Sequence, residues 1–368
     1  MSRALSGFSF ASPEQAVTQA AAPSPGQAGL RELNPAYFAL VMATGIVSIA
    51  AHLLGMAVIG AALFWFNVIA YAVLWALTIA RLSRYPDAVR ADLLDHHRCV
   101  GFFTTVAATC VLASQCLVLY QAQRVALALG ALGLALWAVA TYTIFAILTV
   151  KRHKPDLAAG IHGGWLVAVV ATQSVAVIAA QLATTWGGHD PILFVALVMW
   201  LGGGMLYIWM ISLIFYRYTF FPFSPGDLRP PYWINMGAVA ISTLAGALLV
   251  QAAPHAPFLA GMLAFLKGFT LFFWATATGW IPMLLILGVW RHIYCRFPLR
   301  YDPLYWGAVF PLGMYTVATW RLAEAIELPF IQWIPKGFIW IALAAWTATC
   351  LGLMRALLSQ ARQWARAR

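Results

Sequence analysis

The run GGWLVAVVATQSVAVIAAQLA, residues 163–183, contains no charged side chain. A helix needs roughly 20 apolar residues to cross the hydrocarbon core of a bilayer, so this run predicts a membrane-spanning helix. Similar runs recur along the chain on both sides of it. We predict ten spans: 35–55, 59–80, 100–120, 125–150, 163–183, 191–216, 231–253, 257–290, 303–323 and 331–357. The eighth span is long, and we expect its first turns to bend away from the rest.

The overall composition supports the same class of protein. Hydrophobic residues make up 63% of the 368 residues, charged residues only 9%, and the mean hydropathy is +0.82. A soluble protein needs about a quarter of its residues charged to cover its surface. The composition therefore excludes a soluble enzyme, a nucleic-acid-binding module and a disordered chain. The five cysteines form no CxxC pair and lie in or beside apolar runs, which indicates buried thiols rather than disulfides or a zinc site.

The positive charges predict the topology. All of the 22 Lys and Arg residues except Arg124, Lys267, Arg321 and Lys336 fall on one side of the predicted spans. The positive-inside rule places that side, with both termini and the four long loops, in the cytoplasm. We expect a multi-pass protein of the plasma (inner) membrane whose basic loops face anionic lipid head groups, not nucleic acid. The predicted parts are a disordered cytoplasmic tail (1–30), a ten-helix transmembrane domain (31–357) and a basic cytoplasmic tail (358–368).

Ionisable residues are absent from the middle of the predicted spans. All eleven Asp and Glu residues fall in tails, loops or helix ends, which argues against a proton-coupled pump or a cation pathway. The histidines also lie near span ends or in loops, so haem ligation within the bundle is not expected. His96 and His97 lie beside Asp92 and Asp95, and we interpret them as part of a solvated loop in preference to a metal cluster. We predict no metal and no cofactor.

Neutral polar side chains remain, and the odd-numbered spans contain more of them than the even-numbered spans. This skew predicts five hairpins in which the odd helices lie inside and the even helices face lipid. The hydroxyls of the odd spans would then line a pathway in which neutral dipoles replace the water around an anion. An equally weighted interpretation is that each hydroxyl bonds to its own helix or to a neighbour. The candidate lining residues are Thr44, Ser48, Thr104, Thr105, Thr172, Ser174, Ser242, Thr243 and Thr316.

The ninth span contains Phe310-Pro311 about a third of the way across. Pro311 removes an N–H group and its ring pushes against the preceding turn, so we expect the helix to kink there. A kink beside a large aromatic residue can direct that ring away from the helix axis, towards the centre of the bundle. Phe310 is therefore a candidate for a central position.

Several short motifs resemble one known family. They are Trp306 to Gly313, Asn34-Pro35-Ala36-Tyr37-Phe38 followed by Ala43-Thr44-Gly45, Gly163-Gly164-Trp165-Leu166, Trp233-Ile234-Asn235-Met236-Gly237 and Gly279-Trp280-Ile281-Pro282. In order and spacing they are similar to the tellurite-resistance/dicarboxylate transporter family, which includes the plant guard-cell slow anion channels and bacterial TehA-type proteins. The resemblance covers residue 34 to about residue 355.

The resemblance implies a quasi-five-fold bundle of ten helices around a central pore. A phenylalanine of the ninth helix, which matches Phe310, closes that pore in the family, with Pro311 beside it. It also implies a homotrimer in which each protomer has its own pore. One departure is that Trp165 is followed by Leu166-Val167-Ala168-Val169 without the proline of many relatives, and we expect Gly163 and Gly164 to supply part of the missing bend.

Two cations lie near the non-cytoplasmic ends of predicted spans. Lys267 and Arg321 would concentrate anions at an outer mouth of the pathway. The alternative, which we favour, is that they extend to the membrane interface or, for Arg321, pair with Glu324 one turn away.

The sequence thus predicts membrane transport of small inorganic or carboxylate anions through a central pore gated by Phe310. The alternative is a carrier for a C4-dicarboxylate such as malate, or for sulfite, that works by alternating access. A dicarboxylate carrier needs a cation near the midplane for the second charge, and the only candidates are Lys267 and Arg321 at the edges. We do not expect an enzyme, because no paired carboxylates, metal set or phosphate loop is present.

Overall fold

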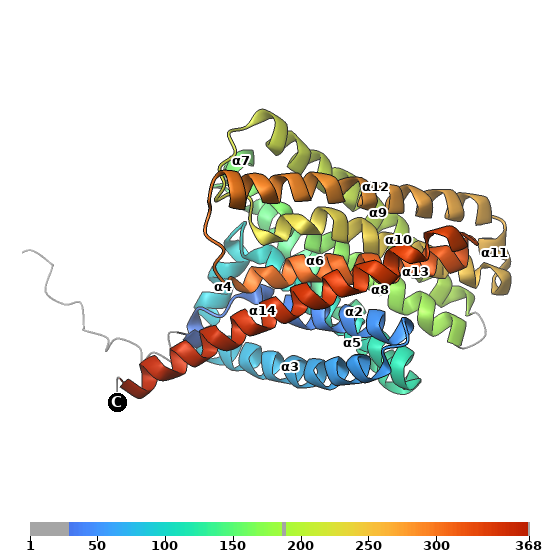
Figure 1. The fold of residues 1–368 in the computed structure, drawn as a ribbon, viewed down its shortest axis with the longest axis horizontal. Helices are drawn as coiled ribbons and strands as arrows, with labels where there is room; N and C mark the ends of the chain where they lie inside the picture. The colour runs from blue at the N-terminus through green and yellow to red at the C-terminus, as the bar shows by residue number, and fades with distance from the viewer. Residues whose placement is uncertain (1–28, 186–188, 367–368) are drawn as a thin grey trace, which may run out of the picture.

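The computed structural model describes residues 29–185 and 189–366. Within these ranges the structure is all-α and contains nine helical segments that are long and apolar enough to cross a membrane. Most helices run roughly parallel or antiparallel to one another along the long axis, whereas α14 crosses the view obliquely (Figure 1). Most of the predicted N-terminal tail, residues 1–28, lies outside the described residues.

The helices form an inner set and an outer set that alternate along the chain. The inner helices are α2 (Ala39–Leu53), α5 (Phe103–Tyr120), α8 (Val167–Thr185), α10 (Ile234–Ala252) and α13 (Trp306–Ala325). The outer helices are α3 (Ala57–Arg84), α6 (Gln123–Val150), α9 (Asp190–Phe220), α12 (Leu263–Val289) and α14 (Trp333–Arg366). In the candidate spans of α2, α5, α8 and α10, 78–94% of the most apolar stretch is buried, against 11–39% for the outer helices. The predicted division into inside and outside helices is therefore correct.

Helix α13 corresponds to the predicted span 303–323 but is not one of the nine segments. It carries Pro311, Arg321 and Glu324, and nearly all of its residues are buried against other helices. A helix enclosed by protein does not need the uniform apolar surface of a helix that faces lipid. The count of ten spans stays a prediction.

The five inner helices contact one another in a closed ring. In chain order α2 contacts α5, α5 contacts α8, α8 contacts α10, α10 contacts α13, and α13 returns to α2. Each outer helix packs against the inner helix that precedes it in the chain. These contacts are what five consecutive hairpins in a circle would produce, and the quasi-five-fold symmetry itself stays a prediction.

A short 3₁₀ turn precedes every inner helix. The turns are η1 (Pro35–Phe38), η2 (Cys99–Phe102), η3 (Gly163–Leu166), η4 (Pro230–Trp233) and η7 (Pro303–Tyr305). They contact one another in the same circular order as the helices that follow them. All five inner helices therefore begin at the same end of the bundle. Gly163 and Gly164 form the start of η3, at the helix whose expected proline is missing.

The end where the inner helices begin is called the basic end here, because four cations lie there at the ends of outer helices. Each donates a hydrogen bond to a backbone carbonyl in the segment that precedes the inner helix of the same hairpin. The pairs are Arg81 with Arg31, Lys151 with Leu94, Arg217 with Ala158, and Arg291 with Leu228. In the fifth hairpin, the ring of Tyr301 packs closely against Gly352 of α14 instead. In each hairpin, a contact of this kind thus joins the end of the outer helix to the segment that leads into the inner helix.

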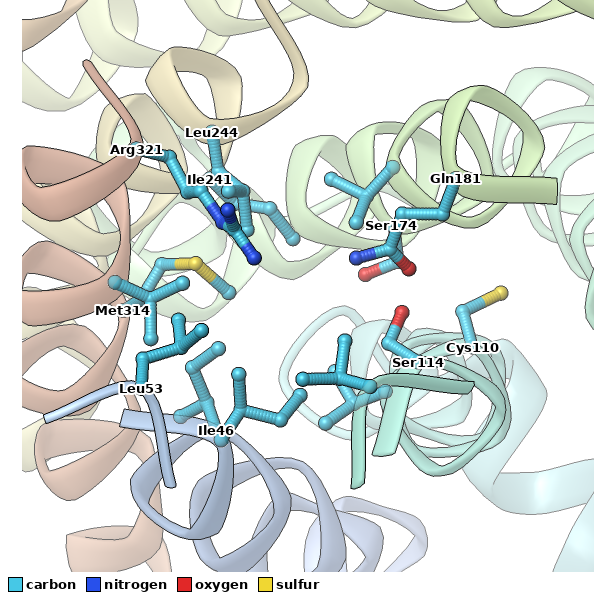
Figure 2. Close-up of a pocket in the computed structure, with 15 residues that line it drawn as sticks. Ile46, Leu53, Cys110, Ser114, Ser174, Gln181, Ile241, Leu244, Met314 and Arg321 are labelled. Atoms are coloured by element: carbon cyan, nitrogen blue, oxygen red, sulfur yellow. The ribbon is translucent and has the colours of Figure 1, made fainter. Parts of the chain in front are cut away.

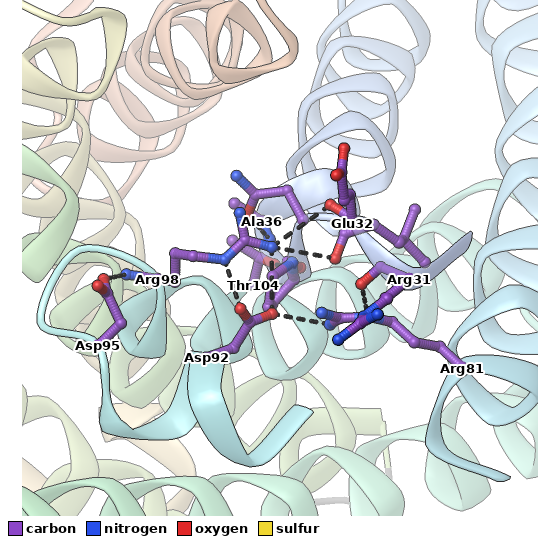
Figure 3. A network of polar contacts seen from close by, with 11 residues as sticks. Arg31, Glu32, Ala36, Arg81, Asp92, Asp95, Arg98 and Thr104 are labelled. Carbon is purple, nitrogen blue, oxygen red and sulfur yellow. Dashed lines mark hydrogen bonds and ion pairs between the residues drawn. The ribbon is translucent and has the colours of Figure 1, made fainter. Parts of the chain in front are cut away.

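The first of these fastenings is part of a buried ionic network (Figure 3). Asp92 follows α3 on the short helix α4 (Pro86–Leu94) and is only 5% exposed. Arg81 lies 2.8 Å from one of its carboxylate oxygens, and Arg98 binds both oxygens. Arg98 also donates to the carbonyl groups of residues 32 and 33. The network therefore fixes the segment that leads into η1.

Three further expectations can be compared with the structure. The start of the predicted eighth span is a separate short helix, α11 (Pro257–Ala260), before α12 begins, so the expected bend is confirmed. Helix α14 continues to Arg366, so the described part of segment 358–368 extends that helix. The five cysteines are free; Cys99, Cys110 and Cys116 are buried, and the other two are half-buried.

Candidate functional site

A cavity of about 350 Å³ opens at the basic end of the bundle. All five inner helices, or the turns before them, contribute to its wall. The lining residues are Asn34, Ala36, Ala39, Met42, Asp95, His97, Arg98, Val100, Gly101, Thr104, His162, Gly164, Val167, Arg229, Pro231, Ile234, Leu304 and Gly307. The cavity therefore lies on the axis of the ring.

A second cavity lies further along the same axis, towards the opposite end. Its volume is about 20 Å³, which holds about one water molecule. The same five helices line it, through Ile46, Ile49, Leu53, Cys110, Val111, Ser114, Val118, Ser174, Val177, Gln181, Ile241, Leu244, Met314, Val317 and Arg321. The two cavities share no lining residue.

The lining positions follow one spacing on all five helices. Intervals of three and four residues alternate, as expected for one face of an α-helix. The faces are 39–42–46–49–53 on α2, 104–107–111–114–118 on α5, 167–170–174–177–181 on α8, 234–237–241–244 on α10 and 307–310–314–317–321 on α13. One position of the face on each of α5, α8, α10 and α13 (107, 170, 237 and 310) lines neither cavity. These positions mark the level at which the axis is closed.

Phe310 occupies that level on α13, one step from Gly307 in the first cavity and from Met314 in the second. Its side chain is fully buried, at 0% exposure. The corresponding positions on α5, α8 and α10 are Ala107, Val170 and Gly237, which are smaller. Phe310 is thus the largest side chain of the layer that separates the cavities.

Helix α13 is held at close range on two sides of Phe310. A methyl group placed on Gly237 of α10 would lie 2.7 Å from Cγ of Pro311 and 3.3 Å from its Cα. One placed on Gly313 would lie 2.9 Å from Val47 of α2. Only glycine permits both approaches, so these two contacts fix the position of the helix that carries Phe310.

The hydroxyl groups predicted to line a pathway are mostly engaged elsewhere. Only Thr104 and Ser174 of the nine line either cavity. Main-chain carbonyl groups three or four residues earlier accept a hydrogen bond from Thr104, Thr105, Thr172, Ser174, Ser242, Thr243 and Thr316. A hydroxyl that donates to its own helix has no proton left for an anion.

Several of these hydroxyls connect the inner helices to the outer ones. Thr44 accepts a hydrogen bond from the indole of Trp346 on α14, and Thr172 accepts one from Trp137 on α6. Ser48 donates to the carbonyl of Gly60 on α3. The alternative in which hydroxyls join neighbouring helices therefore describes these three positions.

Three other groups present free or partly free donors to the second cavity. Ser114 donates to no carbonyl among the described residues, and the side-chain amide of Gln181 makes no hydrogen bond there either, its Oε1 being buried without a donor. Arg321 reaches into the cavity from the opposite wall (Figure 2) and pairs with Glu324 at 3.0 Å. The predicted Arg321–Glu324 pair is confirmed. Lys267 lies on α12 and lines neither cavity.

The first cavity is lined by Asp95 and His97, which the sequence analysis assigned to a solvated loop, and by three residues that it did not single out: Arg98, His162 and Arg229. Arg98, His162 and Arg229 each occupy the position immediately before a 3₁₀ turn. This shared position, just before the start of an inner segment, is the sequence signal by which these three residues could have been identified. Burial, and to a smaller extent the nearby His97 and Arg229, lower the pKa of His162 from 6.5 to about 3, so this ring is neutral.

The structure is an all-α membrane bundle, and its polar cavities follow one another along one axis. This is the architecture of a membrane transport protein. The comparisons with known proteins agree: the sequence profile of the SLAC1 family, described as voltage-dependent anion channel, matches residues 32–354. The chain belongs to this family of anion-transporting membrane proteins.

Individual relatives cover different parts of the chain. An uncharacterised membrane protein of Mycobacterium tuberculosis is 42% identical over 154 residues, which are 41% of this chain and 77% of the relative. An uncharacterised transporter of Methanocaldococcus jannaschii is 23% identical over 88% of this chain and 92% of its own. A sulfite efflux pump of Trichophyton rubrum is 24% identical over 86% of this chain and 88% of its own.

Proposed function

We propose that small monovalent anions pass along the axis of the inner helices and that the ring of Phe310 closes this path. One observation carries the proposal: Phe310 is fully buried and lies between two axial cavities, on the same helical face that lines both. Removal of this ring would join the cavities without removing any group that lines them. Pro311 and the contact with Gly237 hold the ring in place.

The donors near the second cavity favour anions that lose water easily. Ser114 and Gln181 offer neutral dipoles, and the charge of Arg321 is offset by Glu324. Such groups replace hydration without binding an anion so tightly that it cannot leave. Nitrate or chloride would therefore pass more readily than a doubly charged anion.

The alternative, a carrier of sulfite or of a C4-dicarboxylate, is favoured by the likeness to a sulfite efflux pump. A dianion needs a second positive group beside the first. Among the residues that line the second cavity, Arg321 is the only cation, and it is already paired. The geometry therefore supports a monoanion, including the singly protonated form of sulfite.

We also infer that the basic end faces the cytoplasm of a plasma (inner) membrane, since the positive-inside rule places clustered Lys and Arg there. Both chain termini would then be cytoplasmic. The homotrimer implied by the family resemblance is part of the same proposal.

The test is anion flux into proteoliposomes for the parent and for Phe310→Ala, with chloride, nitrate, sulfite and malate measured side by side. We expect the substitution to raise flux at least about tenfold, most strongly for nitrate and chloride, because a plugging ring is the main barrier. Unchanged or lost flux, together with a parent that saturates with malate alone, would reject the plug and favour the carrier.

Phe273→Ala is the matched control. Phe273 is also fully buried, but it lies on outer helix α12 and packs against Trp200 and Phe269. Its loss creates a cavity of similar size away from the axis, at a similar cost in stability of about 3–5 kcal/mol. If Phe273→Ala raised flux as much as Phe310→Ala, the effect would come from loosened packing and not from an opened path.

A further inference from the structure

The cavity at the basic end contains a hydrogen-bond donor that the protein leaves unused. Nδ1 of His162 accepts a hydrogen bond from the backbone N–H of Gly164 at 3.1 Å. The ring is neutral, so an accepting Nδ1 places the proton on Nε2. Nε2 is shielded from bulk solvent and has no partner within hydrogen-bond geometry among the described residues, although the backbone of His96 lies close enough to act on the ring. Buried donors of this kind are normally satisfied, so this one is a candidate to bind a ligand.

A cation that forms no ion pair among the described residues lies near that donor. Arg229 lines the same cavity, and its charge acts on His162. By contrast, the guanidinium of Arg98 is held by Asp92, which it binds through both carboxylate oxygens and which also pairs with Arg81. Asp95, the one acidic residue in the lining, accepts hydrogen bonds from the backbone N–H groups of His97 and Arg98. Arg229 is thus the lining cation whose guanidinium is not already bound to a carboxylate among the described residues.

The backbone adds to this positive character. All five inner helices begin around the cavity, and the N-terminus of a helix carries a partial positive charge. Side chains cap the turns η1, η3 and η7, whereas η2 and η4 have no side-chain cap. Among the lining residues, only Asp95 carries a negative charge that opposes this positive potential.

We propose that the basic-end cavity holds a capture site for a small monovalent anion, bound jointly by the Nε2–H of His162 and the guanidinium of Arg229. The ring of His97, which is exposed and stacks on His162 at 4.8 Å, moves aside as the anion binds. The site rests on the proposed function, because it would load anions onto the path that Phe310 closes. It is distinct from the donors of the second cavity.

Bromide is the probe, since its anomalous X-ray scattering locates it without any measurement of transport. We expect crystals of the full chain in bromide to show a peak in this cavity, within hydrogen-bond distance of His162 and Arg229. The peak should weaken in Arg229→Gln and in His162→Asn. Asn keeps a side-chain acceptor for the N–H of Gly164 but is too short to place a donor where Nε2 lies.

Sided flux provides a second readout. In oriented liposomes, each variant should raise the half-saturating bromide concentration at the basic end at least about tenfold, the effect of one lost hydrogen bond to a charged ligand. Half-saturation from the opposite end should not change. Arg90→Gln is the control, because Arg90 is exposed at the basic end but does not line the cavity.

Two results would overturn the site. One is the absence of bromide from the cavity in parent crystals; the other is an equal rise in half-saturation for Arg90→Gln, which would show a general surface-charge effect. Neither result depends on Phe310→Ala. If that substitution failed to raise flux, the proposed function would be rejected, but a bromide peak would still establish the binding site.

Discussion

Substitution of Gly237 by alanine should displace the gate without altering Phe310. The added methyl group would lie 2.7 Å from Cγ of Pro311, 3.1 Å from its Cβ and 3.3 Å from its Cα. Carbon atoms in contact lie about 3.5–4.0 Å apart, so helices α10 and α13 must separate by about 1 Å. The proline ring cannot rotate away, because its Cα is also too close.

The magnitude follows from two opposing terms. Overpacking of a well-filled site costs about 1–3 kcal/mol. Replacement of a helical glycine by alanine returns about 1 kcal/mol. We therefore expect Gly237→Ala to lower stability by about 0–2 kcal/mol, which leaves the protein folded. The wider spacing between α10 and α13 enlarges the ring around Phe310, so anion flux should rise, by less than in Phe310→Ala.

The assay is proteoliposome flux in a double-mutant cycle with Phe310→Ala. If Gly237 acts by positioning the ring, its substitution should add nothing once the ring is gone. Gly279→Ala is the control, since a methyl group on that glycine of α12 meets nothing within 4 Å. Flux equal to the parent in Gly237→Ala, or effects that simply add in the double variant, would refute the reasoning.

Three other predictions concern groups at different levels of the bundle. Ser114→Ala should lower nitrate flux about threefold by removing a free donor. Thr172→Val, which removes the bond from Trp137 and the bond to the carbonyl of Ala168, should cost about 1 kcal/mol of stability and leave flux unchanged. Asp92→Asn should lower the free energy of unfolding in detergent by about 3–5 kcal/mol, because two arginines lose their buried counter-ion; a loss below about 1 kcal/mol would contradict this. The pKa of His162 is lowered from 6.5 to about 3, so the unfolded chain takes up a proton that the folded chain refuses, and stability should fall as pH drops through this window. Thermal unfolding at a series of pH values should show a shallower decline in His162→Asn than in the parent.

The sequence predicted the helices and their layers better than it predicted the faces of those helices. Apolar length is enough to place a span, and the skew in polar content was enough to separate inner from outer helices. Which way Thr44 or Thr172 points depends on a tryptophan far away in the chain, Trp346 or Trp137, and no local pattern contains that information. The position of Phe310 was readable from the three-and-four spacing, but only once Gly307 and Met314 were known to line cavities.

The residues of the basic-end cavity were missed for a different reason. Arg229 and His162 lie in segments that a span-based reading treats as loops. Their importance comes from the convergence of five turns around one axis, which is a property of the assembled ring. A search for the residue before the 3₁₀ turn that leads into each inner helix would have found His162 and Arg229.

The fastenings between the ends of each hairpin affect how the bundle can deform. Arg81, Lys151, Arg217 and Arg291 each tie a hairpin to itself, and none of these bonds crosses to a neighbouring hairpin's helix pair. A change in the circumference of the ring would leave these fastenings intact but would strain the hydrogen bonds that join neighbouring hairpins, such as Trp137 to Thr172 and Trp346 to Thr44. An outer-helix tryptophan joins four of the hairpins to the inner helix of the next one, through Trp137, Trp200, Trp274 and Trp346, so any sliding of these hairpins past their neighbours must break one of these bonds.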